Sequence, residues 1–251
     1  MTDEGVSDRD CPRHRVPAVT VAQMREVDRS MVEDFGIDLV RMMELAGRHL
    51  AEVARWHLPG RDAAGRSVVV LAGGGGNGGG ALVAARRLAG WGARVTVLLS
   101  TPSARLAGVP AEQLAILERI PVAILDDDPE EDEVADLVLD GLIGYGRNGP
   151  PTGRTAELIG WANGQDAPIV SLDVPSGLDP DTGTPDAPTI LAEATVTLAL
   201  PKTGLLAPEA RLFVGDLYLA DIGVPPELYE RQMLALEVGP VFSRHDIVRL
   251  T

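Results

Sequence analysis

The stretch Gly73–Ala81, GGGGNGGGA, decides how the fold is interpreted. It follows SVVVLA (67–72), an apolar run typical of a buried strand, and precedes LVAARRLAGWG (82–92), which has helical periodicity. Glycines between a strand and a helix let backbone N–H groups face a ligand at the positive end of the helix, which suits a phosphate or pyrophosphate. A tight turn between helix and sheet would explain only a few of them. The stretch therefore predicts a strand–loop–helix unit that binds a nucleotide-type ligand.

The same alternation continues to the C-terminal part of the chain. Short runs rich in β-branched residues, separated by helical segments, predict an α/β fold with a mostly parallel sheet covered on both faces. The helical segments thin out toward the end, so the last strands are expected to be antiparallel or joined by irregular loops. The further expected strands are RVTVLLS (94–100), PVAIL (121–125), ADLVLD (135–140), PIVSLD (168–173), ATVTLAL (194–200) and DLYLAD (216–221), with helices near 110–120 and 154–164.

Two helices are expected before the first strand. In the segment 20–36, Thr20 and Gln23 have the spacing of a capping box, and Gly36 is the expected end. The segment 38–60 has apolar residues at helical spacing and ends at Pro59-Gly60. Residues 1–16 are polar and aperiodic, which predicts a flexible leader followed by a single domain over 17–251.

Composition excludes several classes of function. The formal net charge of −15 argues against nucleic acid or an anionic membrane as a partner, because both would be repelled. A single cysteine, Cys11, excludes an internal disulfide framework and fits a reducing cytoplasm, where we expect a soluble protein. Neither Cys11 nor the histidines (His14, His49, His57 and His245) have zinc-ligand spacing. The acidic run Asp126–Glu133 is interpreted as a solvated connection between strands.

Polar side chains also follow two later strands. Asp140 ends ADLVLD, and Asp173 ends PIVSLD with Ser176 close behind it. Because the ligand crevice of an open parallel sheet lies beyond the carboxyl ends of its strands, these residues and Asn77 are expected to converge. Taken singly, each also fits a cap or a turn residue. Lys202 follows another strand and is interpreted either as a phosphate contact or, more simply, as a solvated lysine.

Common nucleotide and hydrolase motifs are incomplete. A redox dinucleotide site needs an acidic residue at the end of the second strand to hold the ribose, but RVTVLLS ends at Ser100 and is followed by Thr101. The chain has no G-K-[ST] after the glycines and no G-x-S-x-G. An ordinary NAD-linked oxidoreductase is therefore the weakest of the interpretations considered.

Taken together, the segments resemble the NAD(P)H-hydrate epimerase family, also called the YjeF N-terminal domain. The resemblance is carried by VAQMREVDRSMVEDFGI (21–37) and MMELAG (42–47), by AGGGGNGGGALVAARRLAGWG (72–92), by DLVLDGLIGYGRNGP (136–150) and by DVPSG (173–177), with ALPKTG (199–204) and VGDLYLADIGVP (214–225) following. It implies a three-layer αβα, Rossmann-like fold, usually dimeric. It also implies an isomerase that repairs nicotinamide nucleotides by interconverting the R and S forms of hydrated NADH and NADPH.

The resemblance also implies site residues. A bound potassium ion would be held by Asn77, Asp140 and Ser176, helped by backbone carbonyls, and these are hard oxygen donors. Asp173 is our choice for a general acid and base that also contacts substrate. The other expected substrate contacts are Gly76, Asn77, Gly78, Gly79, Gly80, Gly144, Tyr145, Gly146, Arg147, Asn148, Gly149 and Pro150.

The chain departs from the family pattern at four positions. Gly76, Gly80 and Ala81 stand where the family has Asn, Asp and Gly, and Leu45 replaces Asn. The exchange at Gly80 removes a carboxylate from the substrate side. The alternative to an active epimerase is therefore a non-catalytic nucleotide-binding or scaffolding member with the same fold.

Overall fold

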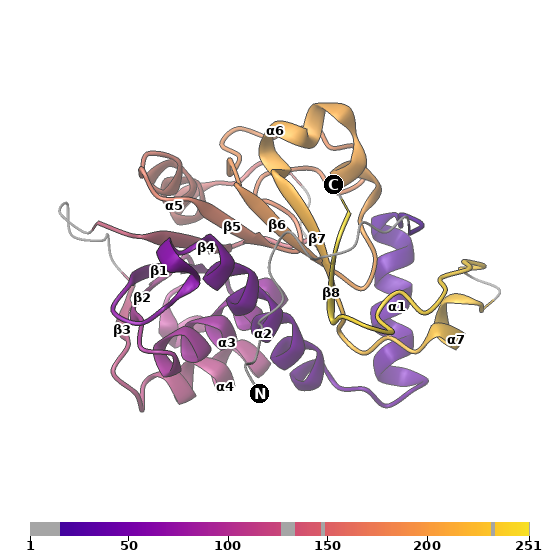
Figure 1. Ribbon diagram of the computed structural model, residues 1–251, viewed down its shortest axis with the longest axis horizontal. Helices are drawn as coiled ribbons and strands as arrows, with labels where there is room; N and C mark the ends of the chain where they lie inside the picture. The colour runs from indigo at the N-terminus through magenta and orange to yellow at the C-terminus, as the bar shows by residue number, and fades with distance from the viewer. Residues whose placement is uncertain (1–15, 127–133, 147–148, 232–233, 251) are drawn as a thin grey trace.

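The computed structural model describes residues 16–126, 134–146, 149–231 and 234–250. The strands in this part of the chain form one sheet in the order β3-β2-β1-β4-β5-β6-β7-β8 (Figure 1). All neighbours in it are parallel except β7 and β8. The strands are β1 (Ser67–Ala72), β2 (Arg94–Leu99), β3 (Ala123–Leu125), β4 (Leu137–Gly141), β5 (Ile169–Leu172), β6 (Ala194–Leu198), β7 (Asp216–Ala220) and β8 (Ile247–Arg249).

Helices cover both faces of the sheet, as the α/β interpretation requires. In Figure 1, α2, α3 and α4 lie below the sheet, whereas α5 and α6 lie above it. The α-helices are α1 (Val21–Glu33), α2 (Leu39–His57), α3 (Gly76–Gly90), α4 (Gly108–Leu117), α5 (Gly153–Asn163), α6 (Arg211–Val214) and α7 (Pro226–Tyr229). Short 3-10 turns lie at Pro59–Arg61, Ser103–Arg105, Thr203–Leu206 and Pro208–Ala210.

The alternation of side chains along β1 explains the two layers of core. Val68 and Val70 belong to the large core on the side of α2 and α3. Val69 and Leu71 belong to the smaller core on the side of α5. Since successive side chains of a strand point to opposite faces, an unbroken apolar run is what a strand buried on both faces needs. The predicted three-layer architecture is confirmed.

The two N-terminal helices begin as expected. The Thr20 hydroxyl accepts from the Gln23 N–H, and the Gln23 side chain accepts from the Thr20 N–H, which completes the capping box. Helix α1 ends at Glu33, before the expected stop at Gly36, and the Asp34 N–H donates to Ser30 in its last turn. Gly36 follows with a left-handed φ of 68°, which glycine favours after a helix. The leader lies outside the described residues except for Val16, which packs against the core.

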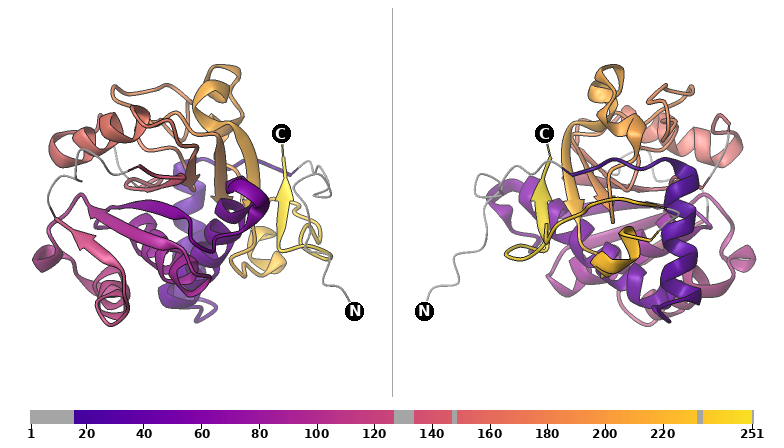
Figure 2. Two further views of the ribbon diagram at one scale, coloured as in Figure 1. Left: turned by 60° about the vertical axis from the view of Figure 1, so that its left-hand side comes forward. Right: turned by 90° about the vertical axis from the view of Figure 1, so that its right-hand side faces the viewer.

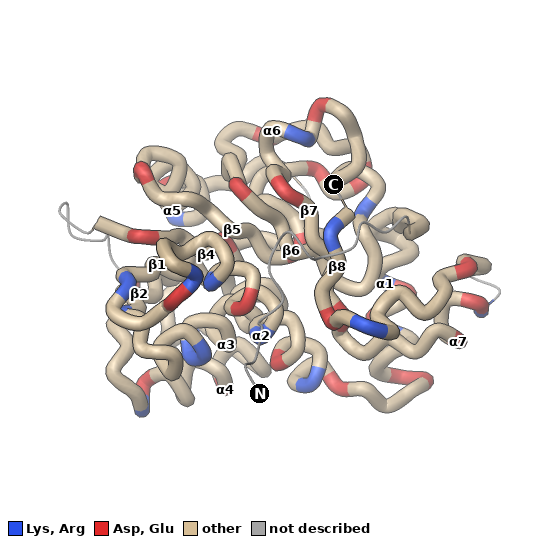
Figure 3. Tube along the Cα trace, in the orientation of Figure 1, with Lys and Arg blue, Asp and Glu red and all other residues tan. Residues whose placement is uncertain are grey.

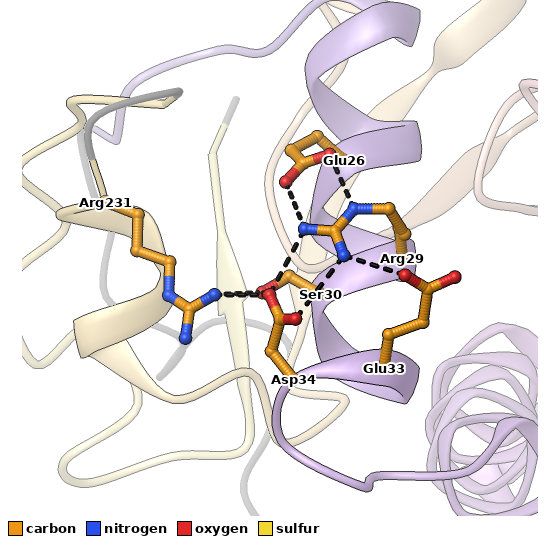
Figure 4. Close-up of polar contacts among 6 residues, drawn as sticks. All are labelled: Glu26, Arg29, Ser30, Glu33, Asp34 and Arg231. Atoms are coloured by element: carbon orange, nitrogen blue, oxygen red, sulfur yellow. Dashed lines mark hydrogen bonds and ion pairs between the residues drawn. The ribbon is translucent and has the colours of Figure 1, made fainter.

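Helix α1 stands at the edge of the molecule beside α7 (Figure 2). Arg29 donates to Glu26 and Glu33, which lie one turn before and after it on the same helix, and also to Asp34 (Figure 4). Arg231, just after α7, reaches the same Asp34 carboxylate. Asp34 thus links α1 to the C-terminal part of the chain.

The glycine stretch differs from the prediction in one respect. We expected the helix to begin after it, yet α3 begins at Gly76. A Cβ built on Gly78 would lie 1.7 Å from the Gly73 carbonyl oxygen, and one on Gly79 would lie 2.6 Å from the Met43 sulfur. These glycines let the first turns of α3 approach the sheet and α2, so packing outweighs the low helix propensity of glycine.

The last strands combine both expected arrangements. Strand β7 is parallel to β6, and β8 pairs antiparallel with β7. Strand β8 was not expected, because IVR is too short to show a periodic pattern.

Basic and acidic positions are interspersed along the described trace (Figure 3). The acidic run Asp126–Glu133 falls outside the described residues except for Asp126, whose carboxylate accepts from the N–H and hydroxyl of Ser103. No helix in the described part of the chain is long and apolar enough to cross a bilayer.

Candidate functional site

Three loop tips meet where the order of the sheet reverses, between β1 and β4. Asn77, in the first turn of α3, donates from Nδ2 to the carbonyl oxygen of Ile143 at 3.1 Å and to that of Leu172 at 2.7 Å. These carbonyls belong to the loop after β4 and to the end of β5. In open α/β sheets this switch point is where ligands bind. The predicted convergence of the three loops is therefore present.

Asp140 lies at the centre of this meeting point and is fully buried. Its carboxylate accepts from the hydroxyls of Ser171 at 2.8 Å and Ser176 at 2.6 Å, and from the Ser176 and Leu142 N–H groups at 2.9 and 3.2 Å. Burial raises the pKa of Asp140 above its ordinary value, although these bonds favour the ionised form. A buried carboxylate whose donors in the described part of the chain are all neutral is a suitable partner for a cation.

The oxygens around Asp140 fit a monovalent metal ion. The Ser176 hydroxyl accepts from the Ile143 N–H at 2.9 Å, which fixes it beside the carboxylate and the Ile143 carbonyl. Asn77 faces that carbonyl with its amide nitrogen. Rotating the Asn77 side-chain amide by half a turn would direct Oδ1, instead of the nitrogen, toward this site. The two orientations have the same shape and differ only in the exchange of the N and O atoms. A carboxylate, a hydroxyl, an amide oxygen and a carbonyl form the hard donor set that potassium prefers.

Asp173 is held by a buried lysine. Its carboxylate forms an ion pair with the Lys202 ammonium, and the exposed fractions of the two side chains are 3% and 0%. Lys202 also donates to the Leu198 carbonyl at 3.1 Å. The expectation that Lys202 is merely solvated is wrong, because its side chain is fully buried and paired with Asp173. Asp173 has a left-handed backbone (φ 67°), a sparsely populated conformation of the kind found at functional sites.

A second carboxyl group faces the same space, and the sequence analysis missed it. Asp28, on α1, accepts a hydrogen bond from the Tyr145 hydroxyl. The Tyr145 ring also lies beneath the Lys202 ammonium, with 5.6 Å from Nζ to the ring centre. Burial raises the pKa of Asp28 and contributes most to the raised pKa of Tyr145. Asp28 lies on a helix that precedes every strand, so no strand-end pattern could have identified it.

Two adjoining cavities surround these groups and share Asp28, Leu39, Gly76, Asn77 and Tyr145. The inner cavity is also lined by Met24, Met42, Met43, Ala46, Leu172, Asp173, Leu198, Lys202 and Ile222. The outer cavity is also lined by Gly74, Gly75, Ser100, Thr101, Leu142, Ile143, Gly144, Gly146 and Thr155.

The predicted contact residues divide into two groups. Those that line a cavity are Gly76, Asn77, Gly144, Tyr145, Gly146 and Asp173. The described lining of both cavities leaves out Gly149 and Pro150, which are exposed, and Gly78, Gly79 and Gly80, which are buried. Arg147 and Asn148 lie outside the described residues. The missing side chains of Gly78–Gly80 make room for protein atoms, so these glycines also serve helix packing, and their contact with a ligand stays a prediction.

The departures at Gly80 and Leu45 are accommodated by apolar packing. A Cβ on Gly80 would lie 2.7 Å from a methyl carbon of Leu172 and 3.8 Å from Cβ of Ala46. Leu45 is half-buried and packs against the main core. In this chain Leu172 therefore occupies space into which a side chain at position 80 would point.

Comparison with known proteins agrees with this geometry. The family model described as YjeF-related protein N-terminus matches residues 40–204. The chain belongs to this family. An NAD(P)H-hydrate epimerase of Dehalogenimonas lykanthroporepellens is 45% identical over 94% of this chain and 94% of its own length.

Two further relatives extend the family comparison. A bifunctional NAD(P)H-hydrate repair enzyme of Salinibacter ruber is 36% identical over 88% of this chain, which corresponds to 42% of that relative. The crystal structure of the yeast protein ynu0, YNL200c, superposes with a TM-score of 0.81 at 25% identity, covering 94% of this chain and 100% of that one.

Proposed function

We propose that this protein is an NAD(P)H-hydrate epimerase, an isomerase that interconverts the R and S forms of hydrated NADH and NADPH. The observation that carries the proposal is the pair of adjoining cavities at the switch point of the sheet, with Asp173 in the inner one. Family membership supports the same reaction, since relatives along nearly the whole chain carry this name.

The reaction is the loss and return of water at one carbon. The hydroxyl-bearing carbon of the hydrated ring lies next to the ring nitrogen, whose lone pair expels hydroxide and leaves an iminium-like cation. Water then adds to either face and gives either epimer. Asp173 would act as acid and base for these steps, which its position in the lining of the inner cavity supports, and a carboxylate beside the ring would also stabilise the cation. Lys202 holds that carboxylate in position.

The outer cavity suits the dinucleotide phosphates. It is floored by Gly74, Gly75 and Gly76, which are exposed and bring bare backbone to the surface. Helix α3 starts there, and among the described residues the N–H groups of Gly76, Asn77 and Gly78 have no acceptor. Free N–H groups at the start of a helix attract an anion. The pyrophosphate would lie at this end, with the hydrated ring in the inner cavity.

Potassium is proposed as the resident ion, held by Asn77, Asp140 and Ser176. It would supply a positive charge that neutralises the buried Asp140 carboxylate and ties the three loops together. An Asp140→Asn variant is expected to lose the increase in thermal stability that potassium gives to the wild type. An unchanged response to potassium, compared with choline as the control cation, would contradict the assignment.

Assembly and location are further proposals. We propose a homodimer, testable by light scattering after size-exclusion chromatography, and a cytoplasmic location, testable by cell fractionation. A monomer at micromolar concentration, or recovery outside the cytoplasmic fraction, would reject the respective statement.

The activity is tested with the separated R hydrate. Purified protein with potassium is expected to form the S hydrate faster than the spontaneous interconversion, followed by chromatography of both epimers. Asp173→Asn is expected to lose roughly two to four orders of magnitude in kcat, the usual contribution of an acid–base group. Binding of the hydrate without acceleration would instead indicate a non-catalytic member of the family.

A further inference from the structure

Asp28 occupies an unusual position for a residue of an N-terminal helix. It lines both the inner and the outer cavity, so it stands where the two meet. Tyr145 donates to its Oδ2, and among the described residues Oδ1 has no hydrogen-bond partner. One carboxyl oxygen is therefore held by the protein while the other is available to a molecule in the cavity.

Asp28 and Asp173 face the inner cavity from different surroundings. Asp173 is paired with the Lys202 ammonium. Within the described part of the chain no cation forms an ion pair with Asp28, and its pKa is raised chiefly by burial. The charged and titratable groups that act on Asp28 are Tyr145, Lys202 and Asp173. The pKa of Tyr229 in α7 is raised chiefly by burial and also by the charges of Asp221 and Asp28. Two carboxyl groups whose surroundings differ in this way commonly divide the roles of acid and base.

We propose that Asp28 is a second catalytic carboxyl group, which delivers the proton to the departing hydroxyl while Asp173 receives the proton of the entering water. The proposal rests on the proposed function and refines it, because one carboxylate no longer has to perform both transfers. Tyr145 acts as a positioning residue, since its hydroxyl holds Oδ2 and leaves Oδ1 directed at the substrate.

The steps balance in atoms and electrons. The Asp28 proton forms an O–H bond as the carbon–oxygen bond breaks, so water leaves with that electron pair and the ring nitrogen forms a double bond to carbon. A second water then forms the new carbon–oxygen bond on the opposite face, and its extra proton goes to Asp173. Exchange with solvent returns Asp28 to the acid and Asp173 to the carboxylate. The reverse epimerisation uses the same two groups with their roles exchanged.

The decisive variant is Asp28→Asn. Its amide oxygen still accepts from Tyr145, so folding and substrate binding are retained while the acid is lost. We expect kcat to fall by roughly two to four orders of magnitude with KM changed by less than about threefold. Glu33→Gln is the matched control, because it makes the same exchange on an exposed face of α1, away from both cavities. In oxygen-18 water the wild type should incorporate the label into both epimers. In Asp28→Asn the rate of this incorporation should fall to the same extent as kcat.

Tyr145→Phe provides a second, independent measurement. The hydroxyl of Tyr145 lowers the pKa of Asp28, so its removal raises that pKa further. Since the acid must be protonated, the alkaline limb of kcat/KM should move to higher pH in this variant, which a merely structural contact would not cause. If the wild type shows no acceleration, the proposed function itself fails. If the wild type is active, either of two results overturns the role of Asp28. One is a kcat of Asp28→Asn within threefold of the wild-type value, and the other is an alkaline limb of kcat/KM that does not move in Tyr145→Phe. Should Asp28→Asn not fold, the limb of Tyr145→Phe decides alone.

Discussion

Replacing Lys202 by Met should destabilise the protein more than most single substitutions. The methionine has nearly the same length, so it preserves the volume of a side chain with an exposed fraction of 0% but removes its charge. The Asp173 carboxylate, which is itself 3% exposed, is then left without its counter-ion. The Leu198 carbonyl also loses its donor. Leaving an uncompensated charge in the interior is the expensive outcome, far more than losing an ion pair at the surface.

The expected loss in the free energy of unfolding is about 3–5 kcal/mol, the range for removing one partner of a buried pair. A chain of this size loses about 2–4 °C in Tm per kcal/mol, so Tm should fall by roughly 6–20 °C. Adding Asp173→Asn to Lys202→Met removes both charges, and a neutral pair of similar volume is often as stable as the ion pair. The double variant is therefore expected to recover most of the loss.

Urea unfolding followed by circular dichroism measures this cycle, with potassium held constant. The two single variants and the double variant together isolate the interaction between the side chains. Two results would show that the unpaired Asp173 charge is not the cause of the instability. One is a loss of less than about 1 kcal/mol in the free energy of unfolding of Lys202→Met, and the other is a double variant no more stable than the single variants.

Three further outcomes are expected. Gly141→Ala should lower the free energy of unfolding by about 1–3 kcal/mol through overpacking, because its Cβ would lie 2.4 Å from a side-chain carbon of α3. Gly146→Ala, whose Cβ would meet nothing within 4 Å, serves as the control in the same urea titration. Burial lowers the pKa of His49 below 6.5, so the unfolded chain binds more protons just below that pH. Stability should then fall as pH falls through this window, and a His49→Gln variant with an unchanged slope of Tm against pH would contradict this. Arg231→Gln should release α7 from Asp34 and speed amide hydrogen exchange in residues 226–231, while the rate of epimerisation stays unchanged. Unaltered exchange would show that this contact does not restrain α7.

The sheet could be predicted because each strand carries its own evidence. An unbroken run such as SVVVLA is needed wherever both faces of a strand are covered, and this holds for β1 regardless of the rest of the fold. Strand β8 has only three residues and one neighbour, so its existence depends on β7 being in place. Local pattern therefore predicts the interior of the sheet better than its edge.

The candidate site shows the same division. Asn77, Asp140 and Ser176 could be identified because they follow strands whose ends lie at one edge of the sheet. The position of Asp28 at the cavities and the burial of Lys202 depend on where α1 and the loop after β6 pack in the folded protein. The residues that neighbour them in the sequence do not indicate this packing. The glycines combine two uses that no local pattern separates, since Gly74–Gly76 line the outer cavity whereas Gly78–Gly80 leave room for neighbouring protein atoms.

The order of the sheet places the two cavities at a seam between two consecutive parts of the chain. Strands β1, β2 and β3 lie on one side of the reversal and all later strands on the other, so each wall is made from an uninterrupted length of polypeptide. Helix α2 precedes the first wall in the sequence, yet it also contacts β5 and β6 of the second. A protein divided between β3 and β4 would thus yield two pieces that each carry half of the pocket, and α2 would join them. Recovery of turnover on mixing such pieces would report their assembly directly.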